Sequence, residues 1–223
     1  MSELPIYLSI LFIICTVYTL FLLYVASGKS NKVLLVSLAW IGIQGALAYS
    51  EFYVDEMSMP PRFPLAFAPT LIFIGYLFFS KSGRKFIDSL DLQTLYLIHV
   101  VRIPVEFGLF GLAIYNTIPM LMTFEGANFD IAAGITVPLI ILGYFYKDWF
   151  SNSFVLIWNL ICLGLLIGII VNSILSVESP IQMQAFDQPN VAMMYFPYIL
   201  LPCYIVPVVI FSHLVCIRRA YSK

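Results

Sequence analysis

Long apolar runs divide the chain, and each is bounded by charged residues or by clusters of proline, glycine and asparagine. A helix that crosses a membrane needs about 20 mostly apolar residues, and these runs approach that length. They predict an all-α, polytopic integral membrane protein with seven transmembrane helices in a single domain, residues 1–223. The predicted spans are Ile6–Ala26, Val33–Ser50, Pro64–Phe79, Thr94–Ile114, Ile131–Phe145, Phe154–Leu175 and Val191–Ile217.

The first apolar run lies at the N-terminus, where a signal peptide is the alternative to a span. Glu3 precedes the run, whereas Lys29 and Lys32 follow it, which is the reverse of the charge order in a signal peptide. The run is also longer than the usual signal core of about 7–15 residues. We therefore expect a retained helix whose N-terminus lies outside the cell.

Composition supports a membrane protein. The chain is 61% hydrophobic and only 10% charged, with a mean hydropathy of +0.97. Soluble domains carry about 25% charged residues, so ordinary soluble enzymes and disordered chains are excluded. We expect a multi-pass protein of the cell membrane, and a bacterial inner membrane in particular.

The basic residues sort strongly by side once the predicted spans alternate across the membrane. Nine of the 11 lie on one side, and Arg62 alone lies on the other. Loops rich in Lys and Arg stay in the cytoplasm, so this bias predicts an outside N-terminus and a cytoplasmic C-terminus. The cytoplasmic set is Lys29, Lys32, Lys81, Arg84, Lys85, Lys147, Arg218, Arg219 and Lys223. The acids expected outside are Glu3, Glu51, Asp55, Glu56, Glu125, Asp130, Glu178 and Asp187.

The links on the predicted outer side are long, and the link after the fourth span holds the apolar stretch Ile118–Met122. Long links with apolar residues are seldom free solvated chain. We expect a cap packed over the outer helix ends; the alternative is that Leu121 and Met122 dip into the lipid headgroups. On the cytoplasmic side, Lys81–Lys85 predicts a basic surface segment attracted to anionic lipid.

The fourth span contains the charged residues that lie deepest in the predicted membrane. Arg102 and Glu106 lie near its midpoint, and at about 100° per residue His99 shares their helix face. A charge at this depth costs at least about 2.5 kcal/mol unless it is paired or hydrated. The i, i+4 spacing predicts a direct ion pair between Arg102 and Glu106.

Pro104 lies between these two residues and removes the helix hydrogen bond to the carbonyl of Val100. The freed carbonyl and a bend in the helix favour a polar pocket at this depth. The alternative is a buried ion pair that only fixes helix packing, although buried pairs are weak sources of stability.

Other spans offer polar groups that could complete such a pocket, and we include Gln44 and Tyr198 among the candidate ligand-binding residues. Each polar group taken alone is more typical of a hydrogen bond between helices. Glu125 and Asp130 are candidates for the pocket entrance, although Asp130 is equally suited to cap the fifth helix. Two loop carboxylates are a weak metal signal, so no metal is expected. The remaining polar candidates are Thr136, Asn159, Asn172, Tyr195 and Tyr204.

The residue inventory excludes several chemistries. A retinal pigment needs a lysine inside the seventh helix, and every lysine here lies at a membrane edge or in the tail. Membrane zinc hydrolases and di-iron enzymes need at least three histidines, and the chain has two. No cofactor is expected, with one alternative: a b-type haem held by His99 and His213.

Three classes of function remain. The favoured one is binding or transport of a small polar or anionic ligand from the outer side, at Arg102, Glu106 and His99. The alternatives are a non-catalytic subunit of a membrane complex and an intramembrane lipid-modifying enzyme, for which no catalytic residue stands out. Beyond the bilayer and the ligand, a membrane-protein partner or a second copy of the chain stays open, and no nucleic acid is expected.

Overall fold

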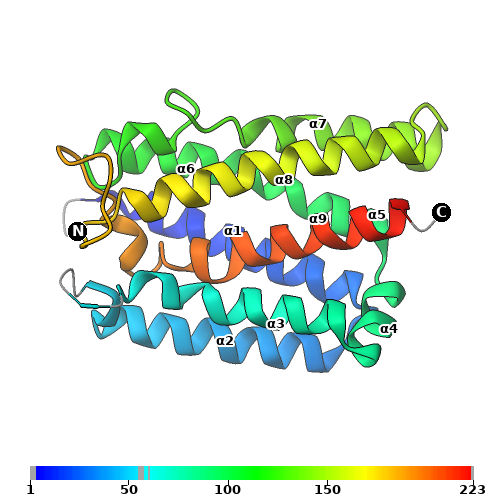
Figure 1. Cartoon of the computed structure of the whole chain (residues 1–223), viewed down its shortest axis with the longest axis horizontal. Coiled ribbons are helices and arrows are strands. Elements are labelled where there is room, and N and C mark those ends of the chain that lie inside the picture. Colours follow the sequence, from blue (N-terminus) through cyan, green and yellow to red (C-terminus); the bar gives the residue numbers. More distant parts are fainter. Residues whose placement is uncertain (1–3, 55–57, 60, 222–223) are drawn as a thin grey trace.

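A computed structural model describes residues 4–54, 58–59 and 61–221. All regular structure among these residues is helical, in agreement with the predicted all-α class. Successive long segments run in alternate directions along one axis and form an elongated bundle (Figure 1). Four residues used above to sort the charges, Glu3, Asp55, Glu56 and Lys223, lie outside the described residues.

Five helical segments are long and apolar enough to cross a membrane, which agrees with a multi-pass membrane protein. The third of them joins α5, a 3₁₀ turn at His99–Val101 and α6. Two shorter apolar segments run beside them: α3 and the helix Ile131–Tyr146. Crossing by these two, and hence a total of seven spans, remains a prediction. The five are α1 (Ile6–Ala26), α2 (Asn31–Tyr49), Leu92–Ile114, α8 (Asn152–Leu175) and Leu201–Tyr221.

The remaining bounds are α3 (Ala68–Phe79), α4 (Lys81–Ser89), α5 (Leu92–Ile98), α6 (Arg102–Ile114), α7 (Ile131–Ile141) and α9 (Val206–Tyr221). Three helix starts have the expected caps. The side chains of Ser80, Asp91 and Ser151 accept hydrogen bonds from backbone amides in the first turns of α4, α5 and α8. The predicted basic surface segment Lys81–Lys85 therefore forms the start of a short helix, α4.

The two ends of the bundle differ in charge. The helices α1, α3 and α9 finish at the same end of the bundle, where α4 also lies, and we call this the basic end (Figure 1). We call the opposite end the loop end. Lys29, Lys32, Lys81 and Arg218 flank helix ends at the basic end. The long links 115–130 and 176–200 lie at the loop end.

The two long links interlock at the loop end. The amides of Val191 and Ala192 donate to the carbonyl of Thr117 at 3.0 and 2.9 Å, and Gln188 donates to the carbonyl of Ala113 at 2.9 Å. Ile118 and Met122 are buried beneath them. The predicted cap is therefore present and is built from both links.

The sequence-based prediction places the start of the seventh span too early. Val191 begins no continuous helix: a 3₁₀ turn at Ala192–Met194 and irregular chain precede a π-helical turn at Leu201–Ile205, which leads into α9. Pro197 and Pro202 lack the amide hydrogen that a regular helix needs at each position. The apolar run therefore becomes helical only from Leu201 onward.

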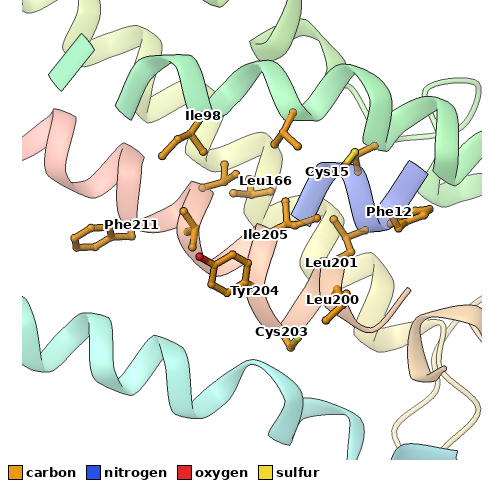
Figure 2. Packing of buried hydrophobic residues seen from close by; sticks show 14 of the residues in the cluster. Phe12, Cys15, Ile98, Leu166, Leu200, Leu201, Cys203, Tyr204, Ile205 and Phe211 are labelled. Carbon is orange, nitrogen blue, oxygen red and sulfur yellow. The ribbon is translucent and has the colours of Figure 1, made fainter. Parts of the chain in front are cut away.

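The apolar core surrounds the Leu201–Tyr221 segment. Figure 2 shows Leu201 and Ile205 of this segment near Phe12 and Cys15 of α1. All four cysteines are buried thiols, as expected for small core residues.

Candidate functional site

The helix α7 begins in the middle of the bundle and not at its end. Its preceding residue, Asp130, places a carboxylate oxygen 3.2 Å from Nη1 of Arg102. Arg102 is about 15 Å along the helix from Leu92 and about 18 Å from Ile114, at 1.5 Å per residue. The link 115–130 therefore runs from the loop end down to mid-depth. Non-helical chain at this depth in a membrane is tolerated only inside protein or beside a cavity.

Gly134 explains how α7 approaches so closely. A Cβ atom at this position would lie 2.8 Å from a side-chain carbon of Ile103 and 3.3 Å from the carbonyl oxygen of His99. The 3₁₀ turn at His99–Val101 is the part of the fourth span against which α7 packs. This turn lies one helical turn before Pro104, which lacks the amide that would bond the carbonyl of Val100. The predicted irregularity of the helix is therefore present.

Arg102 anchors a chain of hydrogen bonds that joins three helices. Its Nη2 donates to Nε2 of His213 at 2.8 Å, because a guanidinium has donors only. The proton of the neutral His213 ring then lies on Nδ1, which donates to Oδ1 of Asn159 at 2.8 Å. The amide nitrogen of Asn159 donates in turn to the hydroxyl of Tyr96 at 2.9 Å. All four side chains are buried.

Glu106 has a different partner from the one predicted. The amide nitrogen of Asn128 donates to Oε1 of Glu106 and to the carbonyl of Met122, and Asn128 Oδ1 accepts from the backbone amide of Asp130. The ion pair of Arg102 is with Asp130. The predicted direct pairing of Arg102 with Glu106 is therefore wrong, because the link 115–130 supplies a partner to each.

His99 joins the cluster through ring contact. Its ring stacks on that of His213 with centroids 4.0 Å apart and planes 25° apart. Its Nε2 lies 3.4 Å from the hydroxyl of Ser212, and Nδ1 has no hydrogen-bond partner among the described residues. The predicted common face of His99, Arg102 and Glu106 is confirmed as a buried face of the fourth span.

A small cavity of about 70 Å³ lies against this cluster and is lined by Arg102, Glu106, Asn128 and Asp130. A cavity of about 150 Å³ holds benzene, whereas one water molecule takes about 30 Å³ of liquid. The space therefore suits a few water molecules or a small ion. Mostly apolar residues of the fourth span, of α8, of the Leu201–Tyr221 segment, of the two long links and of the chain around α3 form the rest of its wall.

Several polar atoms in this wall have unused hydrogen-bonding capacity. Nε and Nη1 of Arg102, Oε2 of Glu106 and Oδ1 of Asp130 are buried and have no hydrogen-bond partner among the described residues. Nη1 and Oδ1 form the ion pair at 3.2 Å but without hydrogen-bond geometry. Buried polar atoms left in this way are rare in proteins, because each costs roughly 1–3 kcal/mol.

No family model, curated protein or solved structure matches this chain.

Four of the predicted site residues do not line this cavity. His99 belongs to the adjacent cluster through its contact with His213, and the other three lie elsewhere. Gln44 accepts a hydrogen bond from the hydroxyl of Tyr53 near the loop end of α2. Tyr198 shares a hydrogen bond with Ser9. Glu125 is exposed on the link 115–130.

Asp130 lies deeper than the predicted entrance. Within the described part of the chain its side chain makes no capping bond to α7, so the capping interpretation is wrong. The carboxylate turns to Arg102 instead, because a buried cation is a stronger partner than the first amides of α7, of which those of Ala132 and Ala133 already donate to backbone carbonyls.

Asn128 was missed as a site residue, because Gly126, Asn128 and Asp130 together indicate a turn. A signal that the link after the fourth span reaches Arg102 was nevertheless present. Two carboxylates, Glu125 and Asp130, follow the span that carries Arg102, and the helix after them, α7, is too short to reach the loop end. His213 was considered only as a haem ligand.

The two histidines do not fit a haem. Their rings stack in direct contact, which leaves no space for a macrocycle between them, and Nε2 of His213 already accepts from Arg102. Among the described residues, no group of three or more His, Cys, Asp and Glu side chains is arranged to hold a metal ion.

The arrangement combines an anion-binding face with acidic groups. The guanidinium of Arg102 and the N-terminal end of α7 both favour negative charge at the cavity. Glu106 and Asp130 supply two carboxylates at the same place. With both ionised and both histidines neutral, the cluster carries one negative charge more than Arg102 balances. Proton uptake and anion binding are therefore favourable together.

Proposed function

We propose that the protein is a seven-span protein of the cell membrane, with its N-terminus outside and its C-terminus in the cytoplasm, that binds a small anionic or polar ligand at Arg102 and carries it inward. The ligand enters from the loop end. Glu106 and Asp130 exchange protons as it binds.

One observation carries this proposal: Arg102 and Glu106 line a cavity at the start of α7, and each has buried hydrogen-bonding atoms without a hydrogen-bond partner among the described residues. Many transporters place small-ligand sites at mid-depth, where broken helices point their termini at the ligand. The small cavity volume restricts the ligand to a few heavy atoms in this state of the protein.

Charge balance links the ligand to protons. An incoming anion competes with Asp130 for Arg102, which would leave two carboxylates and an anion beside one guanidinium. One proton taken up by Asp130 or Glu106 removes part of this excess. Anion affinity is therefore expected to rise as pH falls, by up to about tenfold per pH unit for each proton bound with the ligand.

The binding test uses protein in lipid nanodiscs with chloride, nitrate, formate and acetate as probes, each as its sodium salt and against sodium gluconate. We expect at least one of the small anions to raise the thermal unfolding midpoint, more strongly at acidic pH. Arg102→Met removes this stabilisation, whereas Glu106→Gln keeps binding but flattens its pH dependence. Gln44→Leu is the control, because Gln44 is buried in the same bundle but does not line the cavity.

The transport test uses proteoliposomes that enclose a pH-sensitive dye. An inward gradient of the anion found above should acidify the interior in the wild type and not in Arg102→Met. If both Arg102→Met and Glu106→Gln bind and transport like the wild type, the proposal fails. A co-purified membrane protein together with such insensitivity would instead favour the non-catalytic subunit.

Orientation and span number are tested with single cysteines in cells. Glu125→Cys should react with a membrane-impermeant maleimide from outside, whereas Ser153→Cys should react only after permeabilisation. Both positions are exposed and lie at opposite ends of α7 and its flanking links. Labelling of both from the same side would contradict a crossing by the helix Ile131–Tyr146.

A further inference from the structure

A second, larger cavity lies between α2, α3 and α9. Its volume is about 620 Å³, and its wall is almost entirely apolar. Figure 2 shows two of its lining residues, Tyr204 and Phe211, on the part of the Leu201–Tyr221 segment that lies toward the cyan ribbon. We call this cavity the α2–α9 groove. Representative lining residues are Val36, Trp40, Ile43, Phe73, Leu77 and Val208.

The depth of the groove matches one leaflet of a bilayer. Along α2 its lining runs from Val33 to Ile43, which is about 15 Å of helix at 1.5 Å per residue. The hydrocarbon core is about 30 Å thick, so one leaflet accounts for about 15 Å. The groove begins at the basic end, where Lys32 and Ser30 also line it.

The charge at the mouth distinguishes between apolar occupants. The apolar face of a partner helix would leave the exposed Lys32 at the mouth without a counter-charge, whereas an anionic lipid headgroup supplies one. A single flexible hydrocarbon chain fits a volume within the usual range of about 300–1,000 Å³ for ligand pockets.

The charges at the mouth select the kind of lipid. Lys32 is exposed at the mouth, and Lys29, Arg84 and Lys85 lie at the same end of the bundle. Each basic residue near an anionic surface is worth about 1 kcal/mol. Phe86 of the short basic helix α4 also lines the groove. The mouth therefore attracts a negatively charged headgroup and repels a cationic one.

A polar pair lies a little deeper in the groove. Ser37 and Tyr204 both line it. The buried Tyr204 hydroxyl interacts with Ser37 but makes no hydrogen bond of good geometry among the described residues. Ser37 is about 7.5 Å farther along α2 than Lys32. A glycerophospholipid whose phosphate sits at Lys32 has its ester carbonyls, which are hydrogen-bond acceptors, below the headgroup on the side of Tyr204.

We propose that the α2–α9 groove is a binding site for an anionic glycerophospholipid of the leaflet at the basic end. One acyl chain fills the groove, the phosphate binds Lys32, and an ester carbonyl accepts from Tyr204. This site is independent of the Arg102 cavity and of the ligand proposed for it.

Trp40 provides a reporter inside the groove. Its ring is fixed by a hydrogen bond of 2.9 Å from Nε1 to the carbonyl of Cys203. In a Trp149→Phe, Trp158→Phe background, Trp40 is the remaining tryptophan of the three in the chain. The probes are phosphatidylcholine vesicles that contain either brominated phosphatidylglycerol or brominated phosphatidylcholine at the same mole fraction. Bromine quenches tryptophan only at close range.

We expect brominated phosphatidylglycerol to quench Trp40 at a lower mole fraction than brominated phosphatidylcholine. Lys32→Ala should reduce this preference about fivefold, the equivalent of one basic residue at an anionic surface. Lys147→Ala is the control, because Lys147 lies at the same end but does not line the groove. Equal quenching by the two lipids, or an unchanged preference in Lys32→Ala, overturns the proposal.

A second measurement needs no tryptophan replacement. Native mass spectrometry of the wild-type chain released from detergent should show one retained anionic phospholipid. Ala39→Phe, which fills the groove from α2, should release it, whereas Gly164→Phe on a lipid-facing position of α8 with open space around it should not. Retention of the lipid by Ala39→Phe, or its absence from the wild type, contradicts the proposal.

Discussion

The α2–α3 hairpin and the central helices α6 and α9 are all largely apolar, but they are packed to different extents. In α9 eight of 16 residues are buried, whereas in α2 three of 19 and in α3 one of 12 are buried. The buried charges Arg102, Glu106 and Asp130 all belong to the tightly packed part. Tight packing therefore accompanies the polar cluster, and loose packing accompanies the α2–α9 groove.

The difference in packing has a physical basis in whether a part of the bundle carries ionised groups. Ionised groups at mid-depth need fixed partners, since lipid offers none. Apolar helices without such groups gain little from close contact, because lipid chains solvate them as well as another helix does. The following variants test whether the tightly packed part depends on its charges and close contacts while the hairpin does not.

The largest effect is expected for Asp130→Ala. It leaves Arg102 as a buried cation without its ion partner, which costs roughly 3–5 kcal/mol. Unfolding free energy in mixed micelles measures this cost. The double variant Arg102→Met, Asp130→Ala should recover much of it, because the uncompensated charge is removed. Val36→Ala, on the exposed side of α2, should change stability by less than about 0.5 kcal/mol.

Gly134→Val tests the close approach of α7 to the fourth span. The added side chain meets Ile103 and the carbonyl of His99, so we expect a loss of about 1–3 kcal/mol from overpacking. Gly75→Val in α3 is the matched change, since nothing lies within 4 Å of a Cβ there. Equal losses in the two variants would show that the two parts of the bundle are packed alike.

Asn159→Leu removes the link between His213 and Tyr96. The Nδ1–H of His213 and the hydroxyl of Tyr96 each lose a partner in a buried place, and about 1–3 kcal/mol of stability should be lost. Thr136→Ala, which removes an exposed partner of Trp158, should cost less. Chemical denaturation of both variants in the same detergent gives the comparison.

The smallest effect concerns the ion pair that ties α4 to α9. The hydrogen bond from Arg218 holds the pKa of Asp88 below its ordinary value. The pair therefore adds stability above the pKa of the unfolded carboxyl, and this contribution is lost as pH falls through the lower pKa of the folded state. The side chain of Arg218 is 33% exposed and that of Asp88 is 48% exposed, so solvent screens the pair. Asp88→Asn should shift the thermal midpoint at neutral pH by less than about 2 °C and flatten its acid dependence.

Much of the fold followed from the sequence because a membrane restricts the choices. Apolar run lengths located four of the five long helices to within two residues at each end, and the buried face of His99, Arg102 and Glu106 followed from helical period alone. Periodicity says nothing about which helix lies opposite that face. The partners Asp130, Asn128 and His213 come from other segments, so tertiary packing decides them.

The errors arose where the chain leaves regular geometry. The start of the seventh span and the depth of Asp130 were both misjudged, since an apolar run with prolines and a link with turn residues look alike whether they lie above a membrane or within it. Equally, α2 and α9 are both apolar, and composition does not reveal that only α9 is enclosed.

The start of α7 at mid-depth has a consequence for how the site can change. The wall between the cavity and the loop end consists partly of the link 115–130, whose length and turns are not constrained by a helical hydrogen-bond ladder. Substitutions and small insertions in this link can reshape the cavity while every long helix stays in register. Asn128 and Asp130, at the deep end of the link, both line the cavity and hold Glu106 and Arg102, so a change at these two positions alters the shape of the cavity and the stability of the bundle together.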